Sequence, residues 1–199
     1  MTSKEKIFAN LNPLHNDPVA DKPDLSFLSP TSYQDPLKVF IETSQTNAGA
    51  NVIELNPDED INQRILLAYP EAKIIASNIP DIKANLNPDA IKEKSDLLKV
   101  DVGVVEGKIG VAENGCVWVP QTMKERAICF ASENLIILLD KKSIVSNMHE
   151  AYRLISENSN YFSPYNFGTF ISGPSKTADI EGALVFGAQG AKTLTLILL

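Results

Sequence analysis

The stretch ISGPSKTADIE, residues 171–181, places a lysine, small hydroxyl side chains and two acids directly after a Gly-Pro step. Hydroxyls and a lysine can hold an anion, and carboxylates can orient the lysine. The stretch differs from a P-loop, because Pro174 and Ser175 separate Gly173 from Lys176 and proline lacks the N–H that such a loop needs. The segment therefore suggests an anion site of another kind.

The local pattern around this stretch predicts a strand, a turn and then a helix. Residues 168–172 have the pattern of a strand, and Ser175 or Thr177 could cap a following helix that ends at Gly187. In an α/β sheet, the carboxyl end of such a strand borders the crevice where ligands bind. The predicted helix would direct its N-terminus toward that crevice.

Two interpretations of the acids stay open. Asp179 and Glu181 would lie in the first helical turn, where the helix dipole favours negative charge, and could serve only the helix start. Alternatively, they could orient Lys176 within a site for a polar small molecule.

A second cluster is AENGC, residues 112–116. Glu113 precedes a glycine turn that leads into the apolar residues CVWV, so its carboxylate could act as a base or nucleophile at the mouth of a sheet. The alternative is an ordinary turn, because Asn-Gly is a common hairpin dipeptide.

The elements that position these residues indicate an α/β fold with a mixed or mainly parallel sheet under helices. Residues 1–36 are rich in proline and predict an irregular arm with a short helix capped at Ser3; residues 37–199 predict one domain. A strand–helix–strand order follows residue 51, and helices are expected near 36–49 and 144–158. The apolar runs at 134–140 and 193–199 predict strands that are covered on both faces.

Composition excludes several function classes. The net charge of −7 and the pI of about 4.9 argue against nucleic acid or an anionic membrane as a partner. The apolar runs are too short to span a bilayer and no secretory leader is evident, so we expect a cytoplasmic protein. Two cysteines and two histidines, without ligand spacing, predict neither a metal site nor an iron–sulfur cluster.

The C-terminal sequence resembles a signature of the LUD (lactate-utilization domain) family, in particular its protein C branch. Residues 172–181 match the pattern S/T-G-P-S-[RK]-T-A-D-I-E position by position, and residues 112–118 are similar to the family's A-E-T-G-T-L-V turn. The resemblance covers roughly residues 35–199. It departs at Asn114, where the family usually has Thr, and at Gln189, where it usually has His; an amide can bind a ligand but does not titrate.

The resemblance implies a NagB/RpiA/CoA-transferase-like fold and a role in oxidising L-lactate to pyruvate. The lysine and the hydroxyls of the motif predict a small anionic ligand, and the resemblance implies partner subunits of iron–sulfur and oxidoreductase type that would carry the electrons. No G-x-G-x-x-G follows a strand, so no Rossmann cofactor site is expected. The candidate catalytic residues are Glu113, Lys176 and Asp179. The candidate ligand-binding residues are Asn114, Gly115, Ser172, Gly173, Ser175, Thr177, Glu181 and Gln189.

Three functions follow from these residues. The first is a lactate-utilization component that binds a small anion or acts as an accessory subunit. The second is a stand-alone enzyme of the CoA-transferase or formyltetrahydrofolate cyclo-ligase kind that uses Glu113 as nucleophile or base. The third is a non-catalytic scaffold in which the motif only holds the fold.

Overall fold

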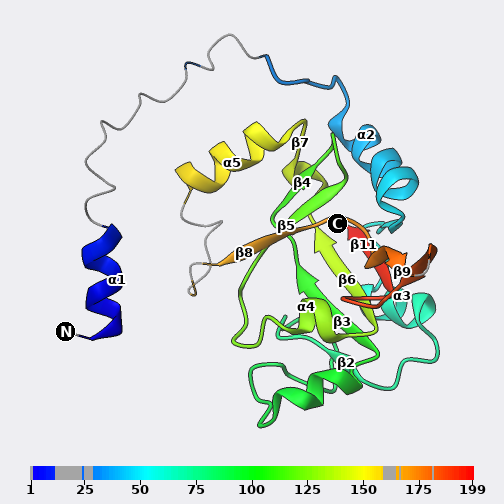
Figure 1. Ribbon diagram of the computed structural model, residues 1–199. Coiled ribbons are helices and arrows are strands. Elements are labelled where there is room, and N and C mark those ends of the chain that lie inside the picture. Colours follow the sequence, from blue (N-terminus) through cyan, green and yellow to red (C-terminus); the bar gives the residue numbers. More distant parts are fainter. Residues whose placement is uncertain (1, 12–23, 25–28, 159–164, 166, 181) are drawn as a thin grey trace.

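A five-stranded parallel sheet forms the centre of the domain in the computed structural model, which describes residues 2–11, 24, 29–158, 165, 167–180 and 182–199 (Figure 1). Its strand order is β1-β11-β6-β3-β2. The strands are β1 (Asn51–Glu54), β2 (Ile75–Ala76), β3 (Val102–Glu106), β6 (Asn134–Leu139) and β11 (Thr193–Leu198). The predicted α/β class with a mainly parallel sheet is confirmed.

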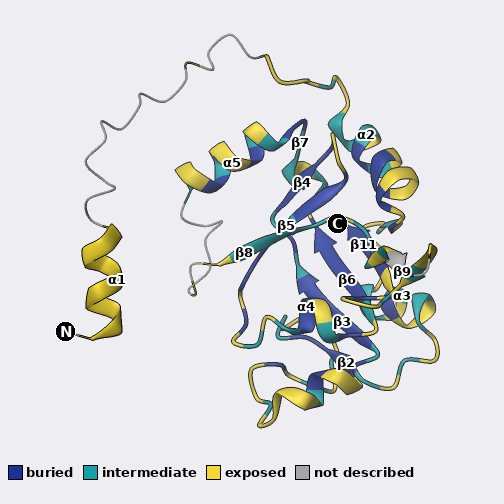
Figure 2. Cartoon of the chain, viewed as in Figure 1, coloured by how far each residue is buried: buried dark blue, intermediate teal, exposed yellow. Residues whose placement is uncertain are grey.

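The two central strands, β6 and β11, are the apolar runs identified in the sequence. They pair in parallel from Thr193 opposite Asn134 to Leu198 opposite Leu139, and their aliphatic side chains are buried (Figure 2). Ile136 and Ile137 point to opposite faces and are both 0% exposed. A strand covered on both faces needs no polar alternation, which explains the continuous apolar sequence.

Different elements cover the two faces of this sheet. On one face, Ile65 of α3 (Ile61–Ala68) packs with Ile136 and Ile197. On the other, Phe40 of α2 (Pro36–Thr43) and Ile128 of α4 (Ile128–Ala131) join Leu135 and its neighbours. Asp60 caps α3 by accepting a hydrogen bond from the Asn62 N–H, and this bond is the main cause of the lowered pKa of Asp60.

The strand–helix–strand unit predicted after residue 51 forms as β1, α3 and β2. The two strands lie at opposite edges of the parallel sheet rather than side by side, because β11, β6 and β3 come between them. The helix predicted at 36–49 also forms: α2 has Pro36 at its first turn and continues into a π-helical turn, η2 (Ser44–Ala48). Gly49 ends this turn with a left-handed φ of 73°, as a C-terminal glycine does.

A second, four-stranded sheet has the order β7-β4-β5-β8. Its strands are β4 (Ile109–Val111), β5 (Cys116–Pro120), β7 (Ile144–Val145) and β8 (Gly168–Ile171). The turn that contains Glu113 joins β4 to β5, which run antiparallel, and β8 lies at the edge. Ala151 and Ile155 of α5 (Met148–Glu157) pack against β4 and β5, so α5 covers this sheet. Short 3₁₀ helices, η3 (Lys94–Lys99) and η4 (Lys141–Ser143), precede β3 and β7.

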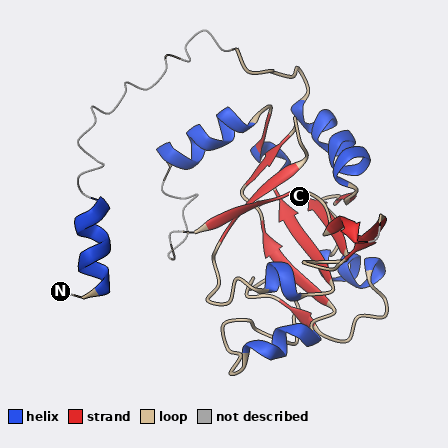
Figure 3. Cartoon of the chain, in the orientation of Figure 1, coloured by secondary structure: helices blue, strands red, loops and turns tan. Residues whose placement is uncertain are grey.

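The prediction of a helix after Ser175 is wrong, because this segment forms a β-hairpin (Figure 3). Strand β9 (Lys176–Ile180) pairs antiparallel with β10 (Ala183–Phe186), and Gly182 lies between them with a φ of 72°. A glycine inside a helix costs about 1 kcal/mol relative to alanine, whereas at a left-handed turn position it is favoured. The helix N-terminus on which part of the anion site was predicted is therefore absent.

The N-terminal residues divide into two parts. All residues of α1 (Ser3–Leu11) are exposed, and its cap is formed by Thr2 with Glu5, not by Ser3 as predicted. In contrast, the backbone around Tyr33 contacts the start of α5. The Tyr33 N–H donates to Ser146 Oγ, and Asn147 Nδ2 donates to the carbonyl of Thr31.

Candidate functional site

The segment SGPSKT lines a pocket of about 320 Å³ between β8, the β9–β10 hairpin and the start of β11. Six of the residues predicted from the sequence as site residues come together here: Ser172, Gly173, Ser175, Lys176, Thr177 and Gln189. The apolar wall includes Leu135, Leu194 and Phe130. A pocket with an apolar wall and a few converging polar groups is the usual form of a small-molecule site.

Lys176 is the charged side chain among the described residues that line this pocket. Its Nζ donates a hydrogen bond of 2.7 Å to the carbonyl of Ala48, in the last turn of η2. A cation is favourable at this place because the helix dipole leaves the last carbonyls partly negative. An ammonium group has three donors, so Lys176 can hold this carbonyl and still donate to an anion in the pocket.

Ser175 organises the loop on the opposite side of the pocket. Its N–H donates to the Ala191 carbonyl over 2.9 Å, and its hydroxyl accepts from the Gln189 N–H over 3.2 Å. Within the described part of the chain, neither the Thr177 hydroxyl nor the Gln189 carboxamide has a hydrogen-bond partner. Both groups are therefore available to a ligand.

Two glycines allow the backbone around the pocket to approach η2. A Cβ on Gly173, whose φ is 70°, would overlap the Ala48 carbonyl oxygen. A Cβ on Gly115, whose φ is 65°, would lie 2.9 Å from the backbone of Ser44. The glycines in both sequence motifs are thus required by close packing against the same helical turn.

Glu113 is not among the residues that line the pocket. Its carboxylate is exposed and accepts a 2.7 Å hydrogen bond from the Met148 N–H, at the first turn of α5. Asn114 connects the turn to the pocket segment, because its carbonyl accepts from the Ser172 hydroxyl over 3.0 Å. The two motifs therefore meet through the backbone, while the Glu113 carboxylate serves the helix start.

The side chains of two predicted acids lie outside the described part of the structure. Asp179 lies in β9, but its side chain is outside the described part of the structure, and Glu181 lies outside the described residues. With a hairpin in place of a helix, the proposed role of both residues in a first helical turn no longer holds.

The pocket lies at the amino ends of the parallel strands, whereas the sequence predicted a site at the carboxyl end of a strand. Leu135 and Leu194, which line it, belong to the first residues of β6 and β11, at their amino ends. The expected crevice at the carboxyl ends was inferred from β8, but β8 belongs to the second sheet and pairs antiparallel with β5. The rule for open parallel sheets therefore does not apply to it.

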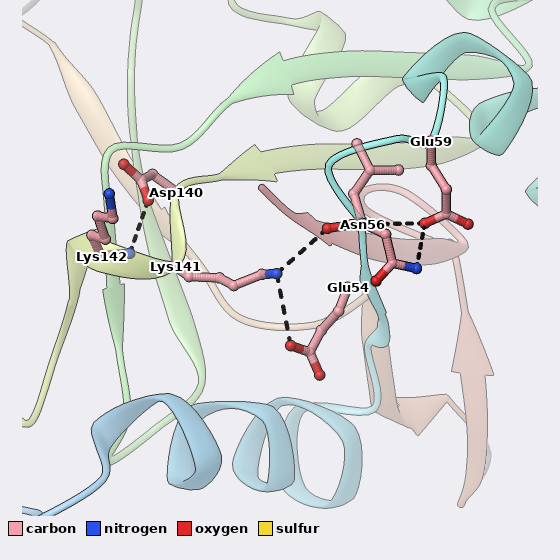
Figure 4. Close-up of polar contacts among 7 residues, drawn as sticks. Glu54, Asn56, Glu59, Asp140, Lys141 and Lys142 are labelled. Carbon is pink, nitrogen blue, oxygen red and sulfur yellow. Dashed lines mark hydrogen bonds and ion pairs between the residues drawn. The ribbon is translucent and has the colours of Figure 1, made fainter.

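Polar side chains contact one another at the carboxyl ends of the parallel strands (Figure 4). After β6, Lys141 lies 3.8 Å from the Glu54 carboxylate and donates to the Leu55 carbonyl over 3.5 Å. Beyond β1, Glu59 accepts hydrogen bonds from Asn56. A hollow of about 450 Å³ beside α2 reaches Glu54, but none of the motif residues lines it.

Sequence reasoning missed Cys129 and Phe130, which follow one another on α4 and line the pocket. Burial raises the pKa of the Cys129 thiol to about 12, so it stays protonated near neutral pH and contributes an apolar surface. Nothing in the local pattern around these residues indicates a site; the packing of α4 against β3 and η3 brings them there. Among the described residues, no cluster of three His, Cys, Asp or Glu side chains could hold a metal ion.

Comparison with known proteins adds a family assignment. The model of the LUD domain family matches residues 39–199. The chain is 26% identical over 170 residues to lactate utilization protein C of Oceanobacillus iheyensis, covering 84% of this chain and 71% of that protein. It is 33% identical over 116 residues to the protein of the same name from Bacillus subtilis, covering 55% and 48% of the two chains.

A solved structure shares the fold. A DUF162 family protein from Deinococcus radiodurans superposes with a TM-score of 0.63 at 16% identity, covering 85% of this chain and 99% of that one. At this identity the likeness concerns the fold alone. Among the described residues, no helix combines the length and apolar character needed to cross a membrane.

Proposed function

Because the chain belongs to the LUD domain family, we propose that it acts in lactate utilization and binds a small organic anion in the pocket beneath SGPSKT. The names of the similar proteins from Oceanobacillus iheyensis and Bacillus subtilis support the first part of this proposal. The pocket supports the second part.

The observation that carries the proposal is the position of Lys176. Lys176 lines a 320 Å³ pocket together with Thr177 and Gln189, whose side chains have no hydrogen-bond partner within the described chain. A carboxylate can accept hydrogen bonds from an ammonium group and from an amide, and bonds that involve charged partners are about twice as strong as neutral ones. The amide at Gln189 would orient the ligand without exchanging a proton.

The proposal gives the chain a binding role beside partner subunits that carry electrons. Both cysteines are buried, Cys116 in β5 and Cys129 in α4, and both thiols have pKa values raised to about 12 by burial. Redox subunits of the lactate-oxidising system would then supply the electron carriers. A CoA-transferase-like mechanism receives less support, because the Glu113 carboxylate is bound to the N-terminus of α5 instead of lining the pocket.

The test is a thermal titration of the wild-type protein and Lys176→Ala with lactate, pyruvate and acetyl-CoA. A ligand that binds only the folded state raises the melting temperature as its concentration rises. We expect a shift with lactate or pyruvate that Lys176→Ala abolishes. Lys142→Ala, which removes an exposed lysine at the far end of β6 (Figure 4), is the matched control and should respond like wild type.

The opposite result would remove the pocket from the proposal. If lactate and pyruvate shift neither protein, or shift Lys176→Ala as much as wild type, the SGPSKT pocket does not bind the anion. Co-purification with the oxidoreductase subunits would then become the measurement that tests a role without ligand binding.

A further inference from the structure

We propose that the pocket beneath SGPSKT selects a short 2-hydroxy acid over the corresponding 2-oxo acid, and that Ser172 makes the distinction. The proposal rests on the proposed anion site and states which of two acids, lactate or pyruvate, that site prefers. The two acids share a carboxylate and a methyl group. They differ at carbon 2, where lactate has a hydroxyl that can donate a hydrogen bond and pyruvate has a carbonyl oxygen that can only accept one.

The hydroxyl proton of Ser172 is already used within the protein. Ser172 follows the end of β8 and lines the pocket, and its Oγ lies 3.0 Å from the carbonyl oxygen of Asn114. A carbonyl oxygen has no hydrogen to give, so Ser172 must be the donor in this bond. Its Oγ therefore has only lone pairs to offer a ligand, and the ligand must supply the hydrogen.

Both partners of this hydrogen bond are held in place. Asn114 lies in the turn between β4 and β5, where its side-chain oxygen accepts from the Cys116 N–H over 3.1 Å. Ser172 is followed by Gly173, whose close approach to the Ala48 carbonyl fixes the backbone on the other side. The Ser172 hydroxyl therefore keeps the same acceptor when a ligand enters the pocket.

Ser175 has the opposite arrangement. Its Oγ accepts from the Gln189 N–H over 3.2 Å, and among the described residues its own proton has no acceptor. Ser175 can therefore donate to a carboxylate, whereas Ser172 can only accept. Three peptide units separate the two serines, which limits the distance between their Cα atoms to about 11 Å, and the chain bends between them. Both serines are thus within reach of one small acid.

The other groups of the pocket suit both acids. The charge of Lys176 attracts either carboxylate, and the apolar wall suits either methyl group. The Thr177 hydroxyl and the Gln189 amide can each donate as well as accept, so they can pair with a hydroxyl or with a carbonyl. Only the Ser172 lone pairs would face another acceptor when pyruvate binds. A polar group left unpaired in this way is what makes a site reject an analogue.

Calorimetric titration with lactate, pyruvate and propionate tests the proposal. Propionate has no oxygen at carbon 2, so it reports the binding of the carboxylate and the methyl group alone. We expect the wild-type protein to bind lactate about tenfold more tightly than pyruvate, the scale of one hydrogen bond. Ser172→Ala should bind lactate and pyruvate equally and leave propionate binding unchanged.

Three further variants separate a role in specificity from a role in structure. Ser172→Thr retains a hydroxyl and should keep the preference for lactate. Ser175→Ala should weaken the binding of all three acids by a similar factor and also keep the preference. Ser143→Ala, in η4 beyond the far end of β6, removes a hydroxyl that likewise donates to a backbone carbonyl, and should bind the acids like wild type.

The outcomes also distinguish this proposal from the anion site on which it rests. Equal affinity of the wild type for lactate and pyruvate, with both lost in Lys176→Ala, would reject the role of Ser172 and leave the anion site standing. A Ser172→Ala protein that binds all three acids more weakly but keeps the preference would reduce Ser172 to a structural role. If Lys176→Ala binds lactate as tightly as wild type, or the wild type binds none of the acids, the anion site itself is wrong.

Discussion

Gly173 lies so close to the Ala48 carbonyl that the pocket depends on the absence of a side chain at this position. A side chain at this position would lower the stability in two ways: the φ of 70° disfavours it, and its Cβ would overlap the Ala48 carbonyl oxygen. Gly182, at the hairpin turn, has a similar φ of 72°, but a Cβ added there would meet no atom of the described residues within 4 Å. Substitution of Gly182 therefore tests backbone strain alone, whereas substitution of Gly173 tests strain together with close packing.

We predict that Gly182→Ala lowers the free energy of unfolding by about 1–2 kcal/mol, the cost of the left-handed conformation alone. Gly173→Ala should cost about 1–3 kcal/mol more, because the backbone must shift to relieve the overlap. Urea denaturation of both variants measures the difference. Equal losses would show that Gly173 is not held against Ala48.

At the scale of elements, the β9–β10 hairpin carries Lys176 and Thr177 but pairs with no other strand among the described residues. Its anchoring comes from Lys176 to Ala48 and from Ser175 to the 187–191 loop. A two-stranded hairpin by itself is marginally stable in water. Ligand contacts to Lys176 would therefore stabilise the element that forms one wall of the site.

Hydrogen exchange tests this expectation. We predict that the amides of β9 and β10 exchange at least roughly tenfold faster than those of β6 and β11, since exchange tracks local opening. Saturating the protein with the anion that binds should slow exchange in the hairpin and leave α3 unchanged. Hairpin amides as protected as those of β6 in the free protein would contradict this prediction.

At the scale of the whole molecule, the contacts of the N-terminal arm show which part of it stabilises the domain. The boundary predicted at residues 36–37 separates Thr31 and Tyr33 from the residues at the start of α5 that they contact, Ser146 and Asn147. The family match begins at residue 39. Helix α1, by contrast, has no buried residue.

We predict that a chain beginning at Pro30 melts within about 2 °C of the full-length protein, because it retains both contacts to the start of α5. A chain beginning at Asp35, which keeps the cap of α2, should melt about 4 °C lower or more: losing two hydrogen bonds costs about 1 kcal/mol each, and 1 kcal/mol shifts the melting temperature by about 2–4 °C in a domain of this size. Calorimetry of the two truncated chains provides the comparison. A lower melting temperature for the chain that begins at Pro30 would mean that residues 1–29 also stabilise the domain.

The sequence by itself determined the architecture of the core and the identity of the key segment. Residues 134–139 and 193–198 are dominated by aliphatic side chains, and burial on both faces of a parallel sheet is what such runs require. The residue types of the SGPSKT motif indicate an anion site, and six of the predicted residues line one pocket.

Only the tertiary structure decided what the segment after Ser175 forms and what surrounds it. Ile180, Leu184 and Val185 suit a helical face, yet Ser175 is bonded to the 187–191 loop and Lys176 to a carbonyl more than a hundred residues away. These long-range contacts hold the segment extended, and no local pattern encodes them. For the same reason, Cys129 and Phe130 reach the pocket only through the packing of α4 against β3 and η3.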